Sequence, residues 1–170
     1  MTSIREEYEL FGVDNYYKEF SEEYRNPHFE TIKKLLSNVN VKGSVLDLCC
    51  GSGEVTKIIS NDRVVGCDPY MSEVYFKNTG KKAFKFNFKE IAEGALYGNY
   101  FDTIICSFAL HLCELSFLEK VLYQLSIITN DLIVISPHKR PIIKENYFKL
   151  DMELKIDRVY LKRYSSKMKL

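Results

Sequence analysis

The sequence of 170 residues predicts a single domain (residues 1–170) of the α/β class, a three-layer sandwich around a mostly parallel, seven-stranded sheet. Short apolar runs alternate with segments of helical length, which is typical of parallel sheets whose strands are buried on both faces. Beyond residue 150 the alternation ends, and two strand-like segments follow each other with little between them. Such neighbours should pair antiparallel, so we expect the sheet to include a C-terminal antiparallel strand.

The individual elements follow from the same patterns. Residues 14–37 are polar and aromatic and indicate one or two helices, with a break near Pro27. Strands are expected over residues 44–49, 63–68, 83–88, 101–107 and 132–136, then a hairpin over 151–156 and 158–165. Helices are expected over residues 54–60, 71–78 and 114–128, where the last has leucine and valine at helical spacing.

The composition is that of a globular chain rather than a disordered or membrane-spanning one. The net charge is +1, with 46% hydrophobic and 28% charged residues. No apolar run approaches the roughly 20 residues that a membrane helix needs. The acidic N-terminus lacks the layout of a secretion signal. We therefore expect a cytoplasmic protein, with a nuclear location as the alternative, and no membrane partner.

The five cysteines predict free thiols. They show no C-x-x-C spacing and have no histidine-rich segment beside them, and four of the five lie in apolar, strand-like stretches. Buried free thiols in a reducing compartment explain this pattern better than disulfides or zinc. We expect no metal site.

Charge is distributed unevenly along the chain. Residues 139–170 carry a net charge of +6, and the preceding residues together carry −5. A basic C-terminal segment could contact phosphate or an acidic partner. The alternative interpretation is that its lysines protect an edge strand from aggregation.

A small-residue turn follows the first expected strand. In Val45–Gly53, read VLDLCCGSG, an apolar run leads into Gly51 and Gly53, and a helix should begin directly after them. Glycines let the backbone approach a ligand closely. The amides at the start of a helix favour a carboxylate or a phosphate. The turn therefore predicts a ligand site.

An acidic residue ends the second expected strand. Asp68 closes the run Val64–Asp68, 15 residues after Gly53. In doubly wound sheets an acid at this place accepts the hydroxyl groups of an unphosphorylated ribose. The simpler alternative is that Asp68 only starts the turn at Pro69.

Together these segments resemble the class I S-adenosylmethionine-dependent methyltransferases. The resemblance rests on Asp47-x-x-x-Gly51-x-Gly53, on Asp68, and on residues 100–111 (YFDTIICSFALH), which are similar to the fourth strand of that family. It covers residues 40–136 well and the two ends by element order alone. It implies an N-terminal helical cap over residues 1–40 and a Rossmann-like core over residues 41–170. Cys49 departs from the family, where most members have glycine.

The resemblance also implies which residues hold the cofactor. Asp47, Cys49, Gly51 and Gly53 would lie at its amino-acid end, and Asp68 would bind the ribose. Pro69, Asn87 and Phe88 would lie near the adenine, with Asn87 at the end of the third strand, where relatives usually have an acid. Ser107 and Phe108 would lie near the methyl group. A nicotinamide cofactor fits less well, because Thr56 stands where its G-x-G-x-x-G motif needs a third glycine.

Three residues are candidates for the chemistry of methyl transfer. His111 follows the fourth expected strand, where it is either a base or the start of the next helix. His138 lies after the fifth strand, with two cations between two prolines, and could contact the acceptor. Tyr17 belongs to an aromatic stripe, shared with Tyr24, that could shape the acceptor pocket or simply pack against the sheet.

The predicted function is methyl transfer from S-adenosylmethionine, with S-adenosylhomocysteine as the product, to a small molecule, a protein or an RNA. RNA would bind through the basic C-terminal segment. The alternative is a catalytically weak, methyltransferase-like subunit that binds or activates a protein partner. Cys49 and Asn87 favour this alternative, whereas Asp47, Gly51, Gly53 and Asp68 favour the enzyme.

Overall fold

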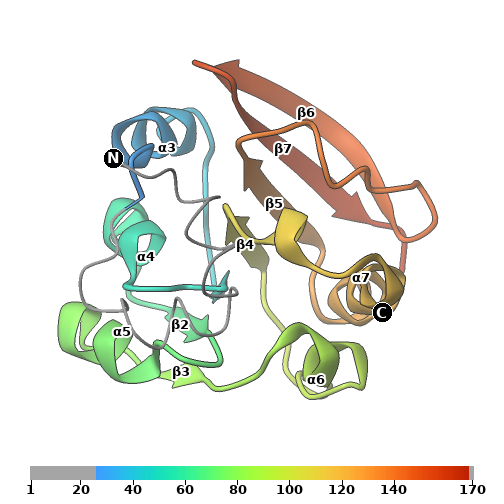
Figure 1. The fold of residues 1–170 in the computed structure, drawn as a ribbon, viewed down its shortest axis with the longest axis horizontal. Coiled ribbons are helices and arrows are strands. Elements are labelled where there is room, and N and C mark those ends of the chain that lie inside the picture. Colours follow the sequence, from blue (N-terminus) through green and yellow to red (C-terminus); the bar gives the residue numbers. More distant parts are fainter. Residues whose placement is uncertain (1–25, 169–170) are drawn as a thin grey trace, which may run out of the picture.

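A computed structural model describes residues 26–168 of the chain and shows one seven-stranded sheet between helices (Figure 1). The strands are β1 (Val45–Leu48), β2 (Val64–Cys67), β3 (Ala83–Phe84), β4 (Thr103–Ser107), β5 (Asp131–Ser136), β6 (Phe148–Ile156) and β7 (Val159–Ser166). The helices are α3 (Phe29–Leu36), α4 (Glu54–Ile59), α5 (Ser72–Thr79), α6 (Phe88–Ala92), the 3₁₀ helix η1 (Leu110–Leu112) and α7 (Leu115–Ile128). The predicted fold class is confirmed.

The strand order is β3-β2-β1-β4-β5-β7-β6, and the first five strands are parallel. Strand β1 lies near the middle, with Leu46 paired to Val65 of β2 on one side and to Ile104 of β4 on the other. Every residue of β1 is buried, as expected for a strand covered on both faces.

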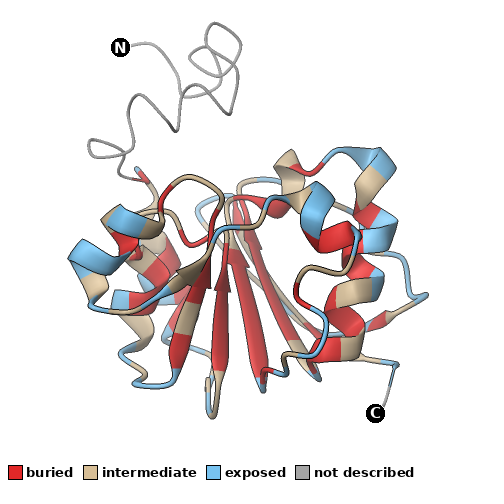
Figure 2. Cartoon of the chain, turned by 90° about the horizontal axis from the view of Figure 1, so that it is seen from below, coloured by how far each residue is buried: buried red, intermediate tan, exposed pale blue. Residues whose placement is uncertain are grey.

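Two hydrophobic clusters make up the core, one on each face of the sheet. Helices α6 and α7 cover one face, and α3 and α4 cover the other. Figure 2 shows the buried strands between two layers of helices whose outer surfaces are exposed. The apolar positions predicted for α7 face the core, with Leu118, Val121, Leu122 and Leu125 all buried. Exposed Leu115 is the exception in that pattern.

The C-terminal hairpin closes the sheet as predicted. Strand β7 pairs antiparallel with both β5 and β6, so β6 runs in the same direction as the parallel strands. Asp157 and Arg158 join the two strands, and both have positive φ. Two left-handed residues in a two-residue loop match the twist of a hairpin, and they move the start of β7 from residue 158 to Val159.

The third strand is much shorter than predicted. Residues 83–88 were expected to be extended, but β3 ends at Phe84 and α6 begins at Phe88. Asn87 is the N-cap of α6: its Oδ1 accepts a hydrogen bond from the amide of Glu90, and the Glu90 carboxylate accepts one from the amide of Asn87. This reciprocal cap ends the extended segment, so Asn87 lies at a helix start rather than at a strand end.

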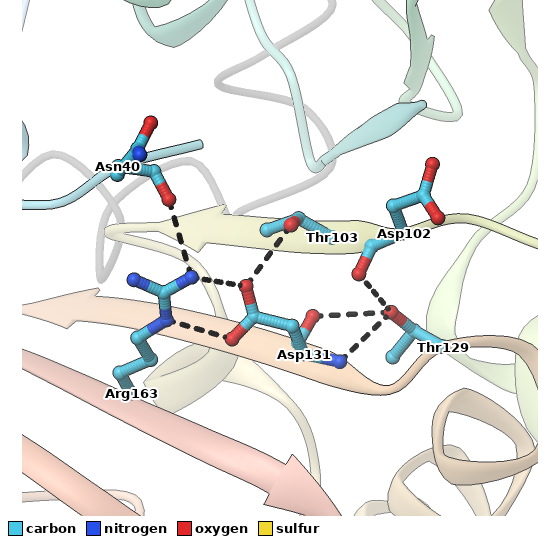
Figure 3. A network of polar contacts seen from close by, with 6 residues as sticks. All are labelled: Asn40, Asp102, Thr103, Thr129, Asp131 and Arg163. Carbon is cyan, nitrogen blue, oxygen red and sulfur yellow. Dashed lines mark hydrogen bonds and ion pairs between the residues drawn. The ribbon is translucent and has the colours of Figure 1, made fainter. Parts of the chain in front are cut away.

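A polar network ties the hairpin to the amino ends of the parallel strands (Figure 3). The Arg163 guanidinium on β7 donates to both carboxylate oxygens of Asp131, at 2.9 and 2.8 Å, and to the carbonyl oxygen of Asn40 at 3.2 Å. Thr103, the first residue of β4, donates to the same carboxylate at 3.0 Å. The network therefore joins the loop before β1 with β4, β5 and β7.

Replacing Arg163 with methionine tests how much this network contributes to stability. The change leaves the partly buried Asp131 carboxylate without its cation, so the free energy of unfolding should fall by about 2 kcal/mol, between the values for exposed and buried pairs. Lys167→Met is the control, because it removes the exposed pair with Glu145 and should cost less than about 0.5 kcal/mol. Urea unfolding measures both, and equal losses would contradict the prediction.

Candidate functional site

A cavity of about 530 Å³ opens at the carboxyl ends of the parallel strands. This volume is typical of a small-molecule site, and in open α/β sheets ligands bind at this edge. The turn after β1, the end of β2, the start of α6 and the end of β4 form its walls. Of the predicted cofactor residues, it is lined by Asp47, Cys49, Gly51, Asp68, Pro69, Asn87, Phe88, Ser107 and Phe108.

The two glycines of the turn have different roles. Both have positive φ, but a Cβ on Gly51 would meet nothing within 4 Å, whereas one on Gly53 would lie 2.4 Å from the Thr79 side chain of α5. Gly51 therefore leaves open space in the cavity wall, and Gly53 permits close packing of α4 against α5. Gly53 is not among the residues that line the cavity, and its contact with a ligand stays a prediction.

Cys49 occupies the left-handed region, with φ of 57°. This backbone conformation suits glycine, the residue that the family resemblance implies at this position, since a side chain with positive φ is strained. The thiol is half-buried and packs against the core. A hydrogen bond with the Cys106 thiol, followed by burial, raises the pKa of Cys49 well above its usual value.

Asp47 is buried at the base of the cavity, in the centre of the sheet. Its Oδ2 accepts hydrogen bonds from the amide and the hydroxyl of Thr56 at 3.2 and 2.7 Å. Within residues 26–168 its Oδ1 accepts no hydrogen bond. Burial raises the pKa of Asp47 to about 7, although the bonds from Thr56 oppose the increase. The carboxyl group is therefore balanced between its neutral and ionised forms near neutral pH.

Asp68 is held at the cavity by backbone amides. Its Oδ1 accepts hydrogen bonds from Tyr70 and Met71 at 2.9 and 3.1 Å, and its Oδ2 accepts one from Gly51 at 3.2 Å. A carboxylate has about four acceptor positions, so three amides leave room for a ligand hydroxyl. Burial raises the pKa of Asp68, and the three amides oppose this. Asp68 begins the turn, as the simpler interpretation required, and also lines the cavity.

The end of β4 presents a strained aromatic residue. Phe108 has φ of 55° and lines the cavity, and its ring stacks on His28 with 5.2 Å between the centroids. Asn26 also lines the cavity, and its backbone N–H donates to the Glu54 carboxylate at 3.1 Å. Asn26, His28 and Glu54 are not predicted from the sequence. The break predicted near Pro27 was the available signal, because it places the chain at this edge before α3.

The two candidate histidines lie side by side. His111 is in η1 after β4, and its ring is 5.9 Å from the ring of exposed His138, edge to face. The Nδ1 atom of His111 is buried and has no hydrogen-bond partner among residues 26–168. Burial, and secondarily the charge of His138, lower the pKa of His111 to about 4. Neither ring lines the cavity, although Ala109 and Leu112 on either side of His111 do.

Other predictions have simpler outcomes. All five cysteines are free thiols, as expected. Tyr17 and Tyr24, and with them most of the predicted N-terminal cap, lie outside the described residues. Within residues 26–168 no group of three or more histidine, cysteine and acidic side chains is arranged to hold a metal ion. No helix in that range has the length and apolar character needed to cross a membrane.

Known proteins share both the sequence pattern and the fold. A family model described as a methyltransferase domain matches residues 20–126. An uncharacterized protein of Schizosaccharomyces pombe is 30% identical over 195 aligned positions, which cover 85% of this chain and 78% of that protein.

Two solved structures illustrate the similarity of fold. The N-methyltransferase NodS of Bradyrhizobium japonicum, in complex with S-adenosylhomocysteine, has a TM-score of 0.65 at 13% identity, covering 84% of this chain and 89% of that one. The magnesium protoporphyrin methyltransferase ChlM of Synechocystis, with bound S-adenosylmethionine, has a TM-score of 0.62 at 17% identity, covering 96% and 94%.

The chain therefore belongs to the methyltransferase-domain family, with the Rossmann-like fold of the class I enzymes. The resemblance inferred from residues 40–136 is confirmed, and the nicotinamide-dependent alternative is not supported. The methyl acceptor is not identified by these similarities.

The low pKa of His111 can be measured directly. Because burial disfavours the charged ring, His111 should stay neutral at pH 6 and be half protonated only near pH 4. The unfolded chain would take up this proton near pH 6.5, so this histidine lowers stability as the pH falls from 6.5 towards 4. NMR titration of the imidazole nitrogens gives the pKa. His138→Gln should raise it, and a His111 pKa above 6.5 would show that burial does not lower it.

Proposed function

We propose that this chain is an S-adenosylmethionine-dependent methyltransferase whose cavity at the carboxyl edge binds the cofactor. The observation that carries the proposal is Asp68, an acid at the end of β2 that three backbone amides hold beside the open space over Gly51. The family and the fold agree with this assignment. S-adenosylhomocysteine would be the product.

The residues present fit the cofactor. A Cβ at Gly51 would project into unfilled space, so the glycine keeps room for the ligand. The unbonded Oδ1 of Asp47 can accept from the ammonium of the amino-acid part. Asp68 can accept from the ribose hydroxyls. Pro69 and Phe88 supply apolar surface for the adenine beside Asn87.

The N-cap role of Asn87 limits what it can do for the adenine. One lone pair of its Oδ1 already accepts from the Glu90 amide, whereas the side-chain NH₂ takes no part in the cap. An NH₂ group suits an acceptor nitrogen of the ring rather than the exocyclic amine. An acidic side chain would instead accept from the exocyclic amine, so the capping role of Asn87 changes which adenine atom this position can contact.

The chemistry asks little of the protein beyond positioning. The bound cofactor supplies an electrophilic methyl group on its sulfonium. Ser107 and Phe108, at the end of β4, would lie on the side where the acceptor enters, and Phe108 is fixed there by His28. A strained, well-packed wall of this kind holds the reacting groups in line and excludes water.

His111 is the proposed base for an acceptor that must lose a proton. Its imidazole is neutral at pH 7 and can therefore accept a proton, and it lies between the cavity-lining residues Ala109 and Leu112. His138, in edge-to-face contact with it, is the proposed acceptor-side partner, and Tyr17 remains a prediction for the same side. A cationic His111 at neutral pH in the titration above would exclude this role.

A second function has one observation in its favour. Cys49 places a side chain with positive φ in the turn, where the family resemblance implies glycine, which would suit a catalytically weak subunit that binds or activates a protein partner. Cofactor affinity separates the two functions.

The cysteine thiols bear on the location of the protein. All five are free and four of them are buried, which suits the reducing cytoplasm or nucleus, and imaging of a tagged chain would test this location.

Calorimetric titration with S-adenosylhomocysteine tests the proposal. The chain should bind it, and Asp68→Asn should weaken binding by about tenfold or more, because a charged acceptor of hydrogen bonds is worth roughly 1.5–3 kcal/mol. Asp62→Asn makes the same chemical change at an exposed position before β2 and should leave the affinity unchanged. No binding at millimolar ligand would refute the enzyme, and equal affinities of the two variants would refute the ribose assignment.

Cofactor affinity should also depend on pH through Asp47. An ammonium group favours the ionised carboxylate, so binding should strengthen as the pH rises towards the Asp47 pKa of about 7. Between about pH 5.5 and pH 7, where an α-amino group stays protonated, the affinity should rise about tenfold. Calorimetry at the two pH values measures this. Asp47→Asn should flatten most of the dependence, and an unchanged slope in that variant would contradict the contact.

A further inference from the structure

Five cations gather at the carboxyl edge of the sheet on the elements that follow β5. Lys139 and Arg140 lie in the loop after β5, and Lys155, Arg158 and Lys162 lie on the β6–β7 hairpin. We call these five residues the basic surface. Four of them are exposed, and Lys162 is half-buried. Among the described residues none of the five forms an ion pair, so their charges are available to a partner.

The loop and the hairpin are held together. The Lys162 ammonium donates to the carbonyl oxygen of Lys139 at 3.2 Å. The loop itself turns tightly, since the Ser136 hydroxyl donates to the carbonyl oxygen of Arg140 at 2.7 Å and accepts from the amide of His138. Figure 1 shows the loop after β5 running along the hairpin. The five cations therefore belong to one surface.

This surface adjoins the acceptor side of the cavity. Strand β6 runs parallel to β5, so the turn at Asp157 and Arg158 lies at the same edge of the sheet as the cavity. At the other end, Lys139 directly follows His138, whose ring contacts His111 between two cavity-lining positions. A ligand lying on the cations would thus reach the proposed base.

The charge and its extent identify the kind of ligand. Only Glu153 and Asp157 oppose the five cations on this part of the hairpin. At about 3.3 Å per residue, the stretch from Val159 to Lys162 alone spans about 10 Å, more than one phosphate group can cover. The ring of half-exposed Tyr160 lies between Arg158 and Lys162, and the Lys155 ammonium lies over it, 5.3 Å from the ring centroid. Repeated cations beside an aromatic residue are typical of single-stranded nucleic-acid binding.

We propose that the basic surface binds single-stranded RNA and holds it against the acceptor side of the cavity. This inference rests on the proposed methyltransferase function, whose acceptor it assigns to a chemical class. The backbone phosphates lie along the cations, and one unstacked nucleotide reaches past His138 towards Phe108. An acidic peptide or a small phosphorylated molecule would use the same charges, and the experiment separates these ligands from RNA.

The test measures binding of a fluorescein-labelled, single-stranded RNA of mixed sequence to the full chain by fluorescence anisotropy. The triple variant Lys139→Gln, Arg140→Gln, Arg158→Gln should weaken binding at least tenfold at about 50 mM salt. Three lost phosphate contacts should reduce the slope of log K against log salt by about 2. The control triple Lys33→Gln, Lys57→Gln, Lys77→Gln removes as many exposed charges from α3, α4 and α5 and should change neither quantity.

Several outcomes would overturn the proposal. Equal weakening in the two triple variants would mean nonspecific attraction, and no weakening in the first would mean that the surface is not used. Tighter binding of a polyglutamate peptide would assign the surface to a protein partner. Equal competition by a mononucleotide would assign it to a small molecule. Affinity for S-adenosylhomocysteine, measured on each variant, reports folding and tests the cofactor site separately. If the chain binds RNA but not S-adenosylhomocysteine, only the proposed function is refuted. If it binds S-adenosylhomocysteine but not RNA, only this inference is refuted.

Discussion

The buried carboxyl group of Asp47 is the constraint on which the site depends. It lies on the central strand of the sheet, where only a bonded polar group is tolerated, and the amide and hydroxyl of Thr56 supply the bonds. The Thr56 hydroxyl is in turn 2.9 Å from the hydroxyl of fully buried Tyr75 on α5. This chain of contacts fixes α4 and α5 against β1. The glycine turn between β1 and α4 is therefore held in one conformation at the edge of the cavity.

Two residues with a strained backbone lie where parallel strands end. Cys49 after β1 and Phe108 after β4 both have positive φ without being glycine, and both line the cavity. Their neighbours hold them there: the Cys106 thiol beside Cys49, and the His28 ring on Phe108. Backbone strain of this kind persists only where packing over-determines it, and it is characteristic of ligand sites. The opposite edge of the sheet instead carries the structural network around Asp131 and Arg163.

Much of the fold could be predicted from the sequence because it depends on periodicity and on local turns. The alternation of apolar runs with helices predicted the parallel sheet, and the short connection at residue 157 predicted the antiparallel hairpin. The third strand was predicted wrongly, because residues 83–88 have an extended pattern while the capping pair of Asn87 and Glu90 favours a helix. Local hydrogen bonding outweighed hydrophobic pattern at that point.

The sequence by itself determined the class of protein and the residues Asp47, Gly51 and Asp68 of the cavity wall, because each lies at the end of a strand or in the turn after it, which local patterns mark. Only the tertiary structure decided which other residues meet at the site. Gly53 packs against α5, where a Cβ would clash with Thr79. The tertiary structure brought His111 to His138, and Asn26 to Glu54, across long stretches of chain. Contacts of this kind leave no periodic signal, because they arise only when the sheet brings the ends of different strands to one edge.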